Sequence, residues 1–316
     1  MLYPWQKNDY QKLASSFLRG NFHALLIYGG IRCGTNTLMD ELLQFMLCHQ
    51  RNGLDACGSC PSCRLYQEHN HPDLYILAAD ETEERKTLQI KVNQIREVTE
   101  FVYRSSHLSG TKVVYLPRLQ ELNISSANAL LKILEEPPVD CIFILQAEDI
   151  ARVMPTIKSR CLKYSVTRPT YEQAVAVLDS SADIDFWLRY YDGEPLFEIP
   201  FTVEQKKLLI ETLQTPSISN IFTLTKELDP KKIGMAKLLE FFIKWQSDLM
   251  QVACACSPSY FVDSNQALQQ LARRLNKDKL YALQDDSIFL LEWHNHPLNH
   301  KLQLENLLLK YQQIYV

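Results

Sequence analysis

Four cysteines between residues 48 and 63 form the pattern in this chain best suited to chemistry. They are Cys48, Cys57, Cys60 and Cys63, spaced C-x8-C-x2-C-x2-C. Two thiolates separated by two residues can reach the same ion, and four thiolates at about 2.3 Å complete the tetrahedral shell of Zn²⁺. Glycine, serine and proline lie between the last three cysteines and favour tight turns. The spacing predicts a structural zinc site with no open coordination position, and free thiols are the alternative.

Two histidines just beyond this cluster are alternative nitrogen ligands. His69 and His71 lie outside the compact cysteine pattern. His71 also precedes Pro72, and such a pair is typical of a loop that leads into a strand. The four cysteines therefore remain the predicted ligand set.

A second chemical pattern covers residues 24–36, where an apolar run is followed by a glycine turn and an amphipathic segment. A phosphate-binding loop reads G-x-x-x-x-G-K-[ST], and Gly29 and Gly34 have the required spacing. Thr35 stands in the lysine position and Asn36 in that of the Mg²⁺-binding hydroxyl. Two charge-handling groups of nucleotide hydrolysis are therefore missing. We predict a nucleotidase fold without catalysis of its own, and a plain strand-turn-helix is the alternative.

The next strand of such a fold shows a matching loss. In an active nucleotidase of this type, acidic residues at its end hold Mg²⁺ and orient water. Here Pro117 and Arg118 follow the apolar run 111–116, and no carboxylate occurs before Glu121. The groups missing from the loop and the acidic residues missing here are independent losses. Both indicate a nucleotidase fold without catalysis of its own.

These residues require an alternating framework of strands and helices. Apolar runs predict buried strands, and spacings of three and four residues predict amphipathic helices. Strands are expected at 24–28, 73–78, 111–116 and 141–146, and helices at 6–19, 37–49, 90–103, 125–136 and 149–158. The polar stretch 80–87 is expected to be a solvated loop. Alternation over 165 residues indicates a mainly parallel α/β sheet.

The C-terminal part of the chain has a different pattern. Helical periodicity dominates from about residue 204, and strand signals are absent. Helices are expected at 203–213, 218–227, 237–254, 265–275, 277–293 and 300–315. Apolar residues such as Leu238, Leu239, Phe242 and Trp245 are expected to pack in a helical core.

Composition restricts the class of protein. The chain has 316 residues and a net charge of −4, so its whole surface has no basic field for non-specific binding of nucleic acid. No run of 18 apolar residues occurs, and the first residues lack a signal-peptide pattern. We therefore expect a cytoplasmic protein with no membrane segment. Its cysteines should stay reduced, which favours metal binding over disulfides.

Several motifs carry a resemblance to a known family. NALLKILEEPP at 128–138 and SRC at 159–161 resemble the clamp-loader branch of the AAA+ proteins. The cysteine module after the loop helix looks like that of the bacterial DNA polymerase III gamma/tau and delta-prime subunits. Because the lysine and the acidic residues are missing, the chain resembles the delta-prime family, whose members do not hydrolyse ATP. HPLNHKLQLENLLL at 296–309 is similar to the C-terminal helix of that family.

The resemblance implies three domains. Residues 1–165 would form an α/β AAA+ (P-loop NTPase-like) domain with the zinc module inserted at 48–63. Residues 166–203 would form a small helical lid, which here lacks the sensor arginine of active members. Residues 204–316 would form an all-α collar that joins subunits into a ring.

The resemblance also assigns a role to Arg160. In the family, the arginine of the SRC motif projects into the ATP site of a neighbouring subunit as an arginine finger. A guanidinium is planar and always charged, so it can stabilise charge on a γ-phosphate in trans. The alternative is a surface arginine at a helix C-terminus. Ser159 is expected to set the turn, and Cys161 to be a small buried residue.

The function implied is that of a non-hydrolysing stator in a hetero-oligomeric clamp loader. Its partners would be gamma/tau and delta, with the sliding clamp and primer-template DNA reached through the complex. ATP hydrolysis and DNA polymerisation would belong to other chains. The alternatives are an active gamma/tau-like ATPase and a zinc-containing adaptor unrelated to replication.

Overall fold

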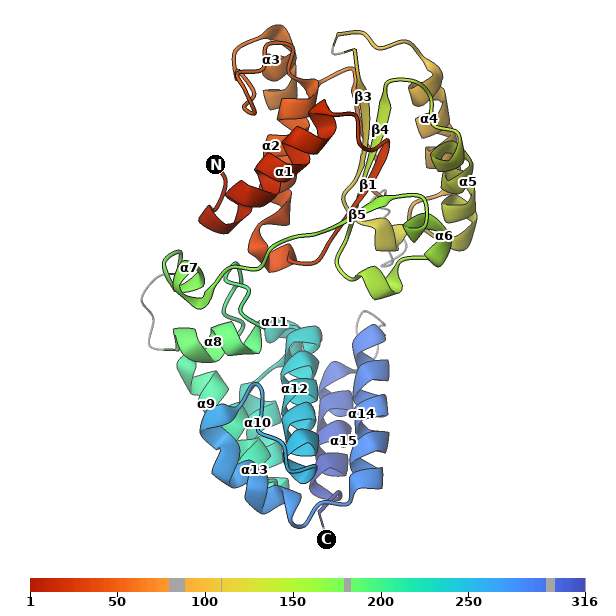
Figure 1. Cartoon of the computed structure of the whole chain (residues 1–316). Coiled ribbons are helices and arrows are strands. Elements are labelled where there is room, and N and C mark those ends of the chain that lie inside the picture. The colour runs from red at the N-terminus through yellow and green to blue at the C-terminus, as the bar shows by residue number, and fades with distance from the viewer. Residues whose placement is uncertain (80–88, 109, 179–182, 294–298, 316) are drawn as a thin grey trace. The chain divides into compact units, whose positions relative to one another are not determined.

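The computed structural model describes residues 1–79, 89–108, 110–178, 183–293 and 299–315 (Figure 1). Its contacts divide the chain into two compact units. The first is Met1–Asp179 with Gly193–Leu196, and the second is Ser180–Asp192 with Phe197–Val316. Residues 166–203 contribute to both units, and the division into three domains stays a prediction. The polar stretch 80–87 lies outside the described residues.

The first unit is built on a five-stranded sheet with the order β2-β3-β4-β1-β5. All four strand pairs are parallel, which confirms the predicted α/β sheet. The strands are β1 (Ala24–Tyr28), β2 (Leu74–Ile76), β3 (Lys112–Leu116), β4 (Cys141–Ala147) and β5 (Leu162–Ser165). Because parallel strands end at the same edge, the residues after β1, β3 and β4 are brought together there.

Helices cover both faces of this sheet (Figure 1). Successive side chains of a strand point to opposite faces, so Leu25 and Ile27 of β1 pack with α1 and α2, whereas Leu26 packs with α4 and α5. The helical segments of the first unit are η1 (Pro4–Gln6), α1 (Lys7–Leu18), η2 (Ile31–Cys33), α2 (Thr35–Leu47), α3 (Pro61–Gln67), α4 (Val92–Tyr103), η3 (Leu119–Glu121), α5 (Ile124–Glu135), η4 (Ile150–Arg152), α6 (Pro155–Lys158) and α7 (Tyr171–Val175).

Three of the departures from the predicted elements lie in the first unit. The helix expected at 149–158 is wrong, because Pro155 has no N–H and begins a separate helix, α6. The sequence analysis missed β5, whose side chains are mostly exposed and therefore show no apolar run. It also missed α3, which begins with Pro61 inside the cysteine pattern.

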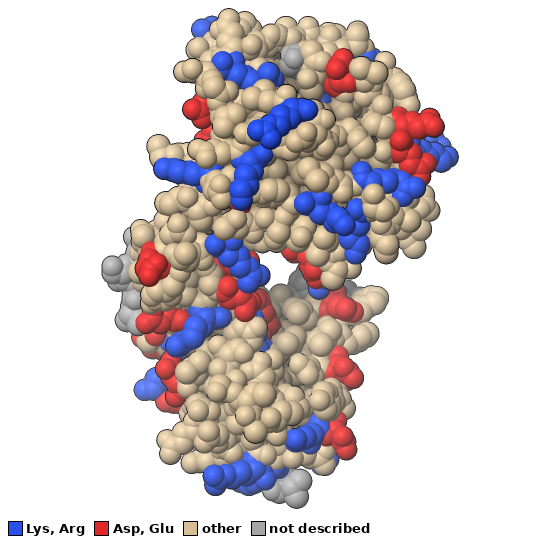
Figure 2. All heavy atoms as spheres, in the orientation of Figure 1, with Lys and Arg blue, Asp and Glu red and all other residues tan. Residues whose placement is uncertain are grey.

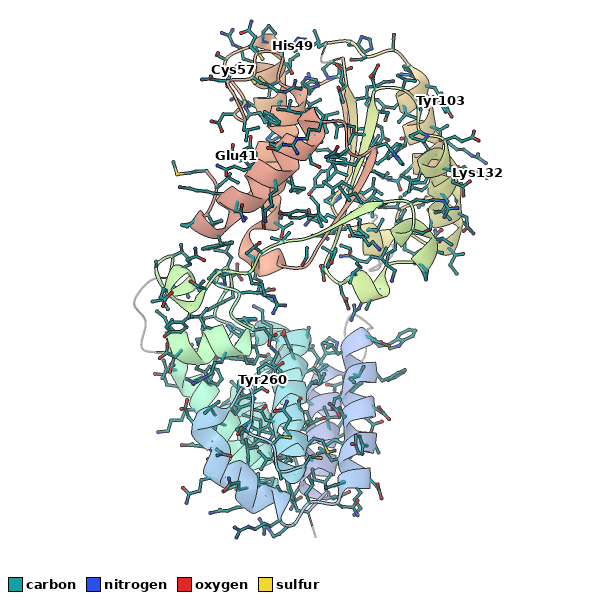
Figure 3. The ribbon with its side chains drawn as sticks, viewed as in Figure 1. Glu41, His49, Cys57, Tyr103, Lys132 and Tyr260 are labelled. Carbon is teal, nitrogen blue, oxygen red and sulfur yellow. The ribbon has the colours of Figure 1, made fainter. Side chains whose placement is uncertain are left out.

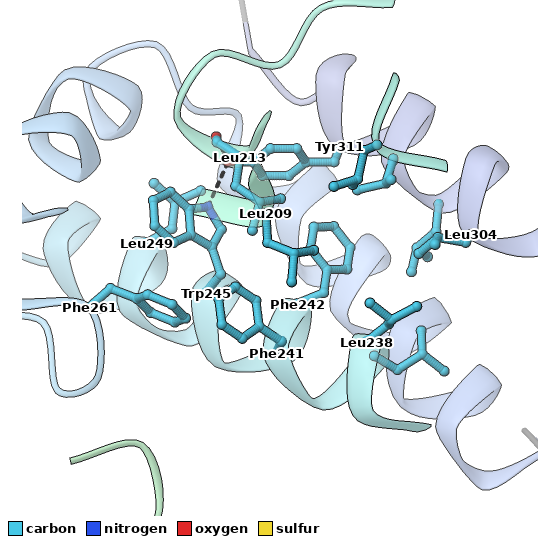
Figure 4. Packing of buried hydrophobic residues seen from close by; sticks show 14 of the residues in the cluster. Leu209, Leu213, Leu238, Phe241, Phe242, Trp245, Leu249, Phe261, Leu304 and Tyr311 are labelled. Carbon is cyan, nitrogen blue, oxygen red and sulfur yellow. Dashed lines mark hydrogen bonds between the residues drawn. The ribbon is translucent and has the colours of Figure 1, made fainter. Parts of the chain in front are cut away.

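The second unit is helical throughout its described residues, as predicted. Its helices are α8 (Ile184–Tyr190), α9 (Val203–Gln214), α10 (Ile218–Glu227), α11 (Pro230–Ile233), α12 (Met235–Ala253), α13 (Asn265–Ala272), α14 (Lys277–Glu292) and α15 (His300–Gln312), with the short η5 (Val262–Ser264). The four apolar residues expected in the core are all buried. Trp245 of α12 donates a 2.7 Å hydrogen bond to the Tyr311 hydroxyl, which in turn donates to the Leu213 carbonyl (Figure 4). This bond satisfies the buried indole N–H.

The surface carries charges of both signs. Figure 2 shows lysine and arginine side chains distributed over the visible face of the first unit, with acidic side chains among them. This mixture agrees with the small net charge of −4. Among the described helices, none is both long enough and apolar enough to cross a membrane.

Candidate four-cysteine centre and degenerate phosphate loop

The four predicted metal ligands converge in the first unit. Their sulfur atoms all lie within 4.8 Å of one another, near the end of α2 and the start of α3, where Figure 3 labels Cys57. The Cys57 sulfur is 3.6 Å from that of Cys48 and 3.9 Å from that of Cys63. Four ligands at the Zn–S distance in a tetrahedron are separated by about 3.8 Å. The sulfur spacing therefore fits a tetrahedral thiolate site.

Backbone amides support the sulfur atoms from within the cluster. The amides of Cys57, Cys60 and Cys63 donate to the sulfurs of Cys48, Cys57 and Cys60 respectively, at 3.3 to 3.4 Å. Hydrogen bonds from the backbone of Ser59 and Cys60 lower the pKa of Cys57 to about 6. Burial raises the pKa of Cys63 well above its usual range. A bound cation would bring the four thiols to the thiolate form that metal ligation requires.

His71 is not a ligand in this arrangement, because both of its ring nitrogens have other partners. Its Nδ1 accepts a 3.1 Å hydrogen bond from the amide of Asp73. Its Nε2 is therefore the protonated nitrogen, and it donates to the Ser62 hydroxyl at 2.7 Å. That hydroxyl donates to the Leu47 carbonyl, next to Cys48. Burial lowers the pKa of His71 and so favours the neutral ring. The histidine joins α3 to the segment before β2.

Asp73 extends this connection to the segment that precedes β3. Its side chain is fully buried, and its two carboxylate oxygens accept from the amides of His107 and Leu108 at 2.7 and 2.8 Å. Its own carbonyl accepts from the amide of Val113 in β3. A chain of hydrogen bonds therefore runs from the cysteine module to the segment between α4 and β3. The sequence predicts only a loop at His71 and Pro72, because the partners of Asp73 lie 34 and 35 positions away and no local spacing signals them.

The degenerate phosphate loop uses its own polar groups. Gly29, Gly30 and Gly34 adopt left-handed φ angles of 84°, 65° and 78°, which favour glycine. Thr35, in the lysine position, is 1% exposed, and its hydroxyl donates to the Gly30 carbonyl at 2.7 Å. The same hydroxyl lies 3.3 Å from the Gly29 carbonyl. The side chain that replaces the lysine is therefore directed into the loop.

The N-terminal segment closes over this loop. Trp5 donates its indole N–H to the Cys33 carbonyl at 2.9 Å, and the Gln6 amide donates to the Gly34 carbonyl at 2.6 Å. A Cβ at Gly34 would come within 2.8 Å of the Tyr3 ring. These residues hold the loop in one conformation, and the sequence analysis did not identify Tyr3 or Trp5. Because the partners lie about 28 positions away, no local pattern signals the contact.

Neutral side chains link the sheet edge to the start of α2. Gln146, in β4, donates to the Asn36 side chain at 3.2 Å and accepts from the Tyr115 hydroxyl at 2.6 Å. The first carboxylate after β3, Glu121, pairs with Arg118 at 3.2 Å. Asn36 and Gln146 border a cavity of about 850 Å³, whose lining includes none of the residues 29–35. Amide and phenol groups thus form the network between β3, β4 and α2, and the carboxylates of Asp40, Glu121 and Glu148 line the same cavity.

Arg160 lies on the surface of the first unit, immediately after α6. About a third of its side chain is exposed, at 32%. One terminal nitrogen, Nη1, donates to the Thr156 carbonyl at 2.9 Å and lies 3.3 Å from the Ser159 hydroxyl. The other, Nη2, forms an ion pair with Glu135 of α5. The neighbouring Cys161 is buried, as expected, and burial raises its pKa to about 12.

The comparisons with known proteins identify the family. A model described as "DNA polymerase III, delta subunit" matches residues 5–170, more than half of the chain. This chain belongs to the DNA polymerase III delta-prime subunit family. Its relative in Pseudomonas aeruginosa, DNA polymerase III subunit delta′, is 28% identical over 329 residues, covering 98% of this chain and 94% of that protein.

Other delta-prime relatives align over shorter stretches. Subunit delta′ of Escherichia coli is 38% identical over 177 residues, covering 56% of this chain and 52% of its own length. Subunit delta′ of Haemophilus influenzae is 35% identical over 214 residues, covering 67% and 62%. Among solved structures, a DNA polymerase III gamma subunit-related protein from Thermotoga maritima aligns over 96% of this chain and 99% of its own, with 17% identity and a TM-score of 0.46.

Proposed function

We propose that this delta-prime family member is a non-hydrolysing stator of the clamp loader, which provides Arg160 in trans to the ATP site of a neighbouring gamma/tau subunit. The first half of the proposal is that this chain does not hydrolyse ATP. It rests on Thr35, which takes the lysine position and whose hydroxyl donates to a carbonyl of its own loop. The neutral Tyr115, Gln146 and Asn36 network supports it, because none of these groups carries charge for Mg²⁺ or phosphate.

The second half of the proposal concerns the guanidinium of Arg160. It lies at the surface on a short turn, directly after a helix of four residues, and part of it is open to solvent. A guanidinium presents two parallel N–H groups that match two phosphate oxygens and stays charged at any physiological pH. Placed beside a γ-phosphate, it would stabilise the charge of the transition state in another subunit's site.

The remaining parts of the chain serve assembly in this proposal. The second unit would act as the collar, and exposed apolar side chains on α14, such as Tyr281 and Phe289, would contact neighbouring subunits. The four cysteines would hold a structural Zn²⁺. The partners would be gamma/tau and delta in a cytoplasmic complex that reaches the sliding clamp and primer-template DNA.

The test is ATP hydrolysis by a clamp loader reconstituted with gamma/tau, delta and this chain, compared with its Arg160→Ala variant. We expect normal assembly, with hydrolysis at the site served by Arg160 reduced by about 10³-fold or more. The total rate of ATP hydrolysis should therefore fall by the amount that this one site contributes. The isolated chain should not hydrolyse ATP. Equal turnover by the variant would contradict the finger, and turnover by the isolated chain would favour the gamma/tau-like alternative.

A further inference from the structure

The Arg160 side chain is already occupied by groups of its own chain. Nη2 pairs with the Glu135 carboxylate, and Nη1 donates to the Thr156 carbonyl. A phosphate that binds arginine bidentately takes two parallel N–H groups, and the two terminal nitrogens can supply one such pair. In the unassembled chain, a phosphate that binds both terminal nitrogens therefore competes with Glu135 and the Thr156 carbonyl for their N–H groups.

Glu135 has a physical reason to keep a cation near it. It is the last residue of α5 and is followed by Glu136, so two carboxylates lie at the negative end of a helix dipole. Among the ion pairs of the described residues, Arg160 is the cation that Glu135 contacts. The same guanidinium also reaches a carbonyl in the last turn of α6. It thus lies against the C-terminal ends of two helices.

We propose that Glu135 is the internal counter-ion of Arg160, which occupies the guanidinium in the free chain and is displaced when the γ-phosphate of a neighbouring subunit binds. This inference rests on the proposed function of Arg160. Glu135 is then a positioning residue that sets how readily the arginine transfers to phosphate. Both side chains are partly exposed, at 32% and 49%, so the exchange needs no unfolding of the core.

The pair makes a quantitative prediction for nucleotide binding. Glu135→Gln keeps the shape of the side chain but removes the competing charge. Exposed ion pairs contribute little, so we expect the Arg160-dependent part of ATPγS binding to tighten by between about 1.4-fold and 5-fold. The maximal rate of ATP hydrolysis should not change, because phosphate has replaced Glu135 by then. A change in ATPγS affinity without a change in the maximal rate of hydrolysis would show that Glu135 competes with phosphate for Arg160. A purely structural role of Glu135 would not give this result.

The experiment uses the reconstituted loader and four forms of this chain: wild type, Glu135→Gln, Arg160→Ala and the double variant. The Arg160-dependent part is the difference between the titrations with and without Arg160. Glu136→Gln is the matched control, because Glu136 is an exposed neighbour outside the ion pairs described for the chain. Thermal unfolding of each variant confirms that the chain is folded.

Tighter ATPγS binding in Glu135→Gln, absent in the Arg160→Ala background and absent in Glu136→Gln, would support the counter-ion. Unchanged or weaker binding in Glu135→Gln would overturn it, and so would an effect that persists without Arg160. If Arg160→Ala still loses hydrolysis in those cases, the proposed finger stands. If Arg160→Ala changes neither binding nor hydrolysis, both the finger and the counter-ion are wrong.

Discussion

The two ends of helix α2 differ in how their polar groups are used. At its start, Thr35 bonds to the loop carbonyls and Asn36 bonds to Gln146. At its end, Cys48 and three other cysteines direct their sulfur atoms at one point. The first end has the glycines of a phosphate site, but its polar side chains form hydrogen bonds with other groups of the same chain. The second end has converging donor atoms of one kind.

This difference is the one expected if the second end holds a metal ion and the first end, as we propose, does not hydrolyse nucleotide. Groups that bind a ligand converge on a common point and compete for it, whereas groups in a disused site pair with each other. In the phosphate loop, the Thr35 hydroxyl takes the position of the lysine, and the neighbouring Asn36 is paired with Gln146. In the cysteine module, four acceptors of the same sign gain from a cation. The predictions below test this contrast, beginning with the largest effect.

Removing one thiol from the cysteine module should have the largest effect. Cys60→Ser should lower bound zinc from about one equivalent to less than half and destabilise the first unit by several kcal/mol, because metal binding is coupled to folding. Metal analysis and thermal unfolding measure the two changes. Cys256→Ser, at an exposed cysteine of the second unit, is the control. Wild-type protein with less than about half an equivalent of zinc would contradict the four-thiolate site.

Removing the histidine that connects this module to β2 should have a smaller effect. His71→Ala leaves the buried Asp73 amide without its partner and removes the bond that the Ser62 hydroxyl accepts, which costs about 1–3 kcal/mol. Hydrogen exchange at the amides of His107 and Leu108 should also become faster, because Asp73 is less well held. His23→Ala, at an exposed histidine, should change neither quantity. Equal stability of the two variants would show that the connection is unimportant.

The smallest of these effects is expected in the phosphate loop. Thr35→Val keeps the side-chain volume but removes the bond to the Gly30 carbonyl, and should lower the free energy of unfolding by about 1 kcal/mol. Thr37→Val, two residues further along the same helix and less buried, is the control. Denaturant unfolding measures both. If Thr35→Val is as stable as wild type, the hydroxyl does not hold the loop, and the contrast between the two ends of α2 weakens.

Most of the regular structure could be predicted from the sequence. The limits of β1 and α10 match the predicted residues, and the other predicted strands and most of the predicted helices differ by only a few residues. Helical and strand periodicities depend on neighbours within a few positions, so they can be read from a short stretch. The cysteine spacing is also local, and the convergence of four sulfurs follows from it. The edge strand β5 was missed because its exposed side chains show no such pattern.

The sequence by itself determined which residue types stand at the loop and in the cysteine module, and therefore which chemistry is present and which is missing. Only the tertiary structure decided their partners: Trp5 on the loop, His71 on Ser62 and Glu135 on Arg160. The last pair is separated by 25 positions and joins two helices. Such contacts depend on strand order and helix packing, which bring distant residues together, and no local spacing encodes them.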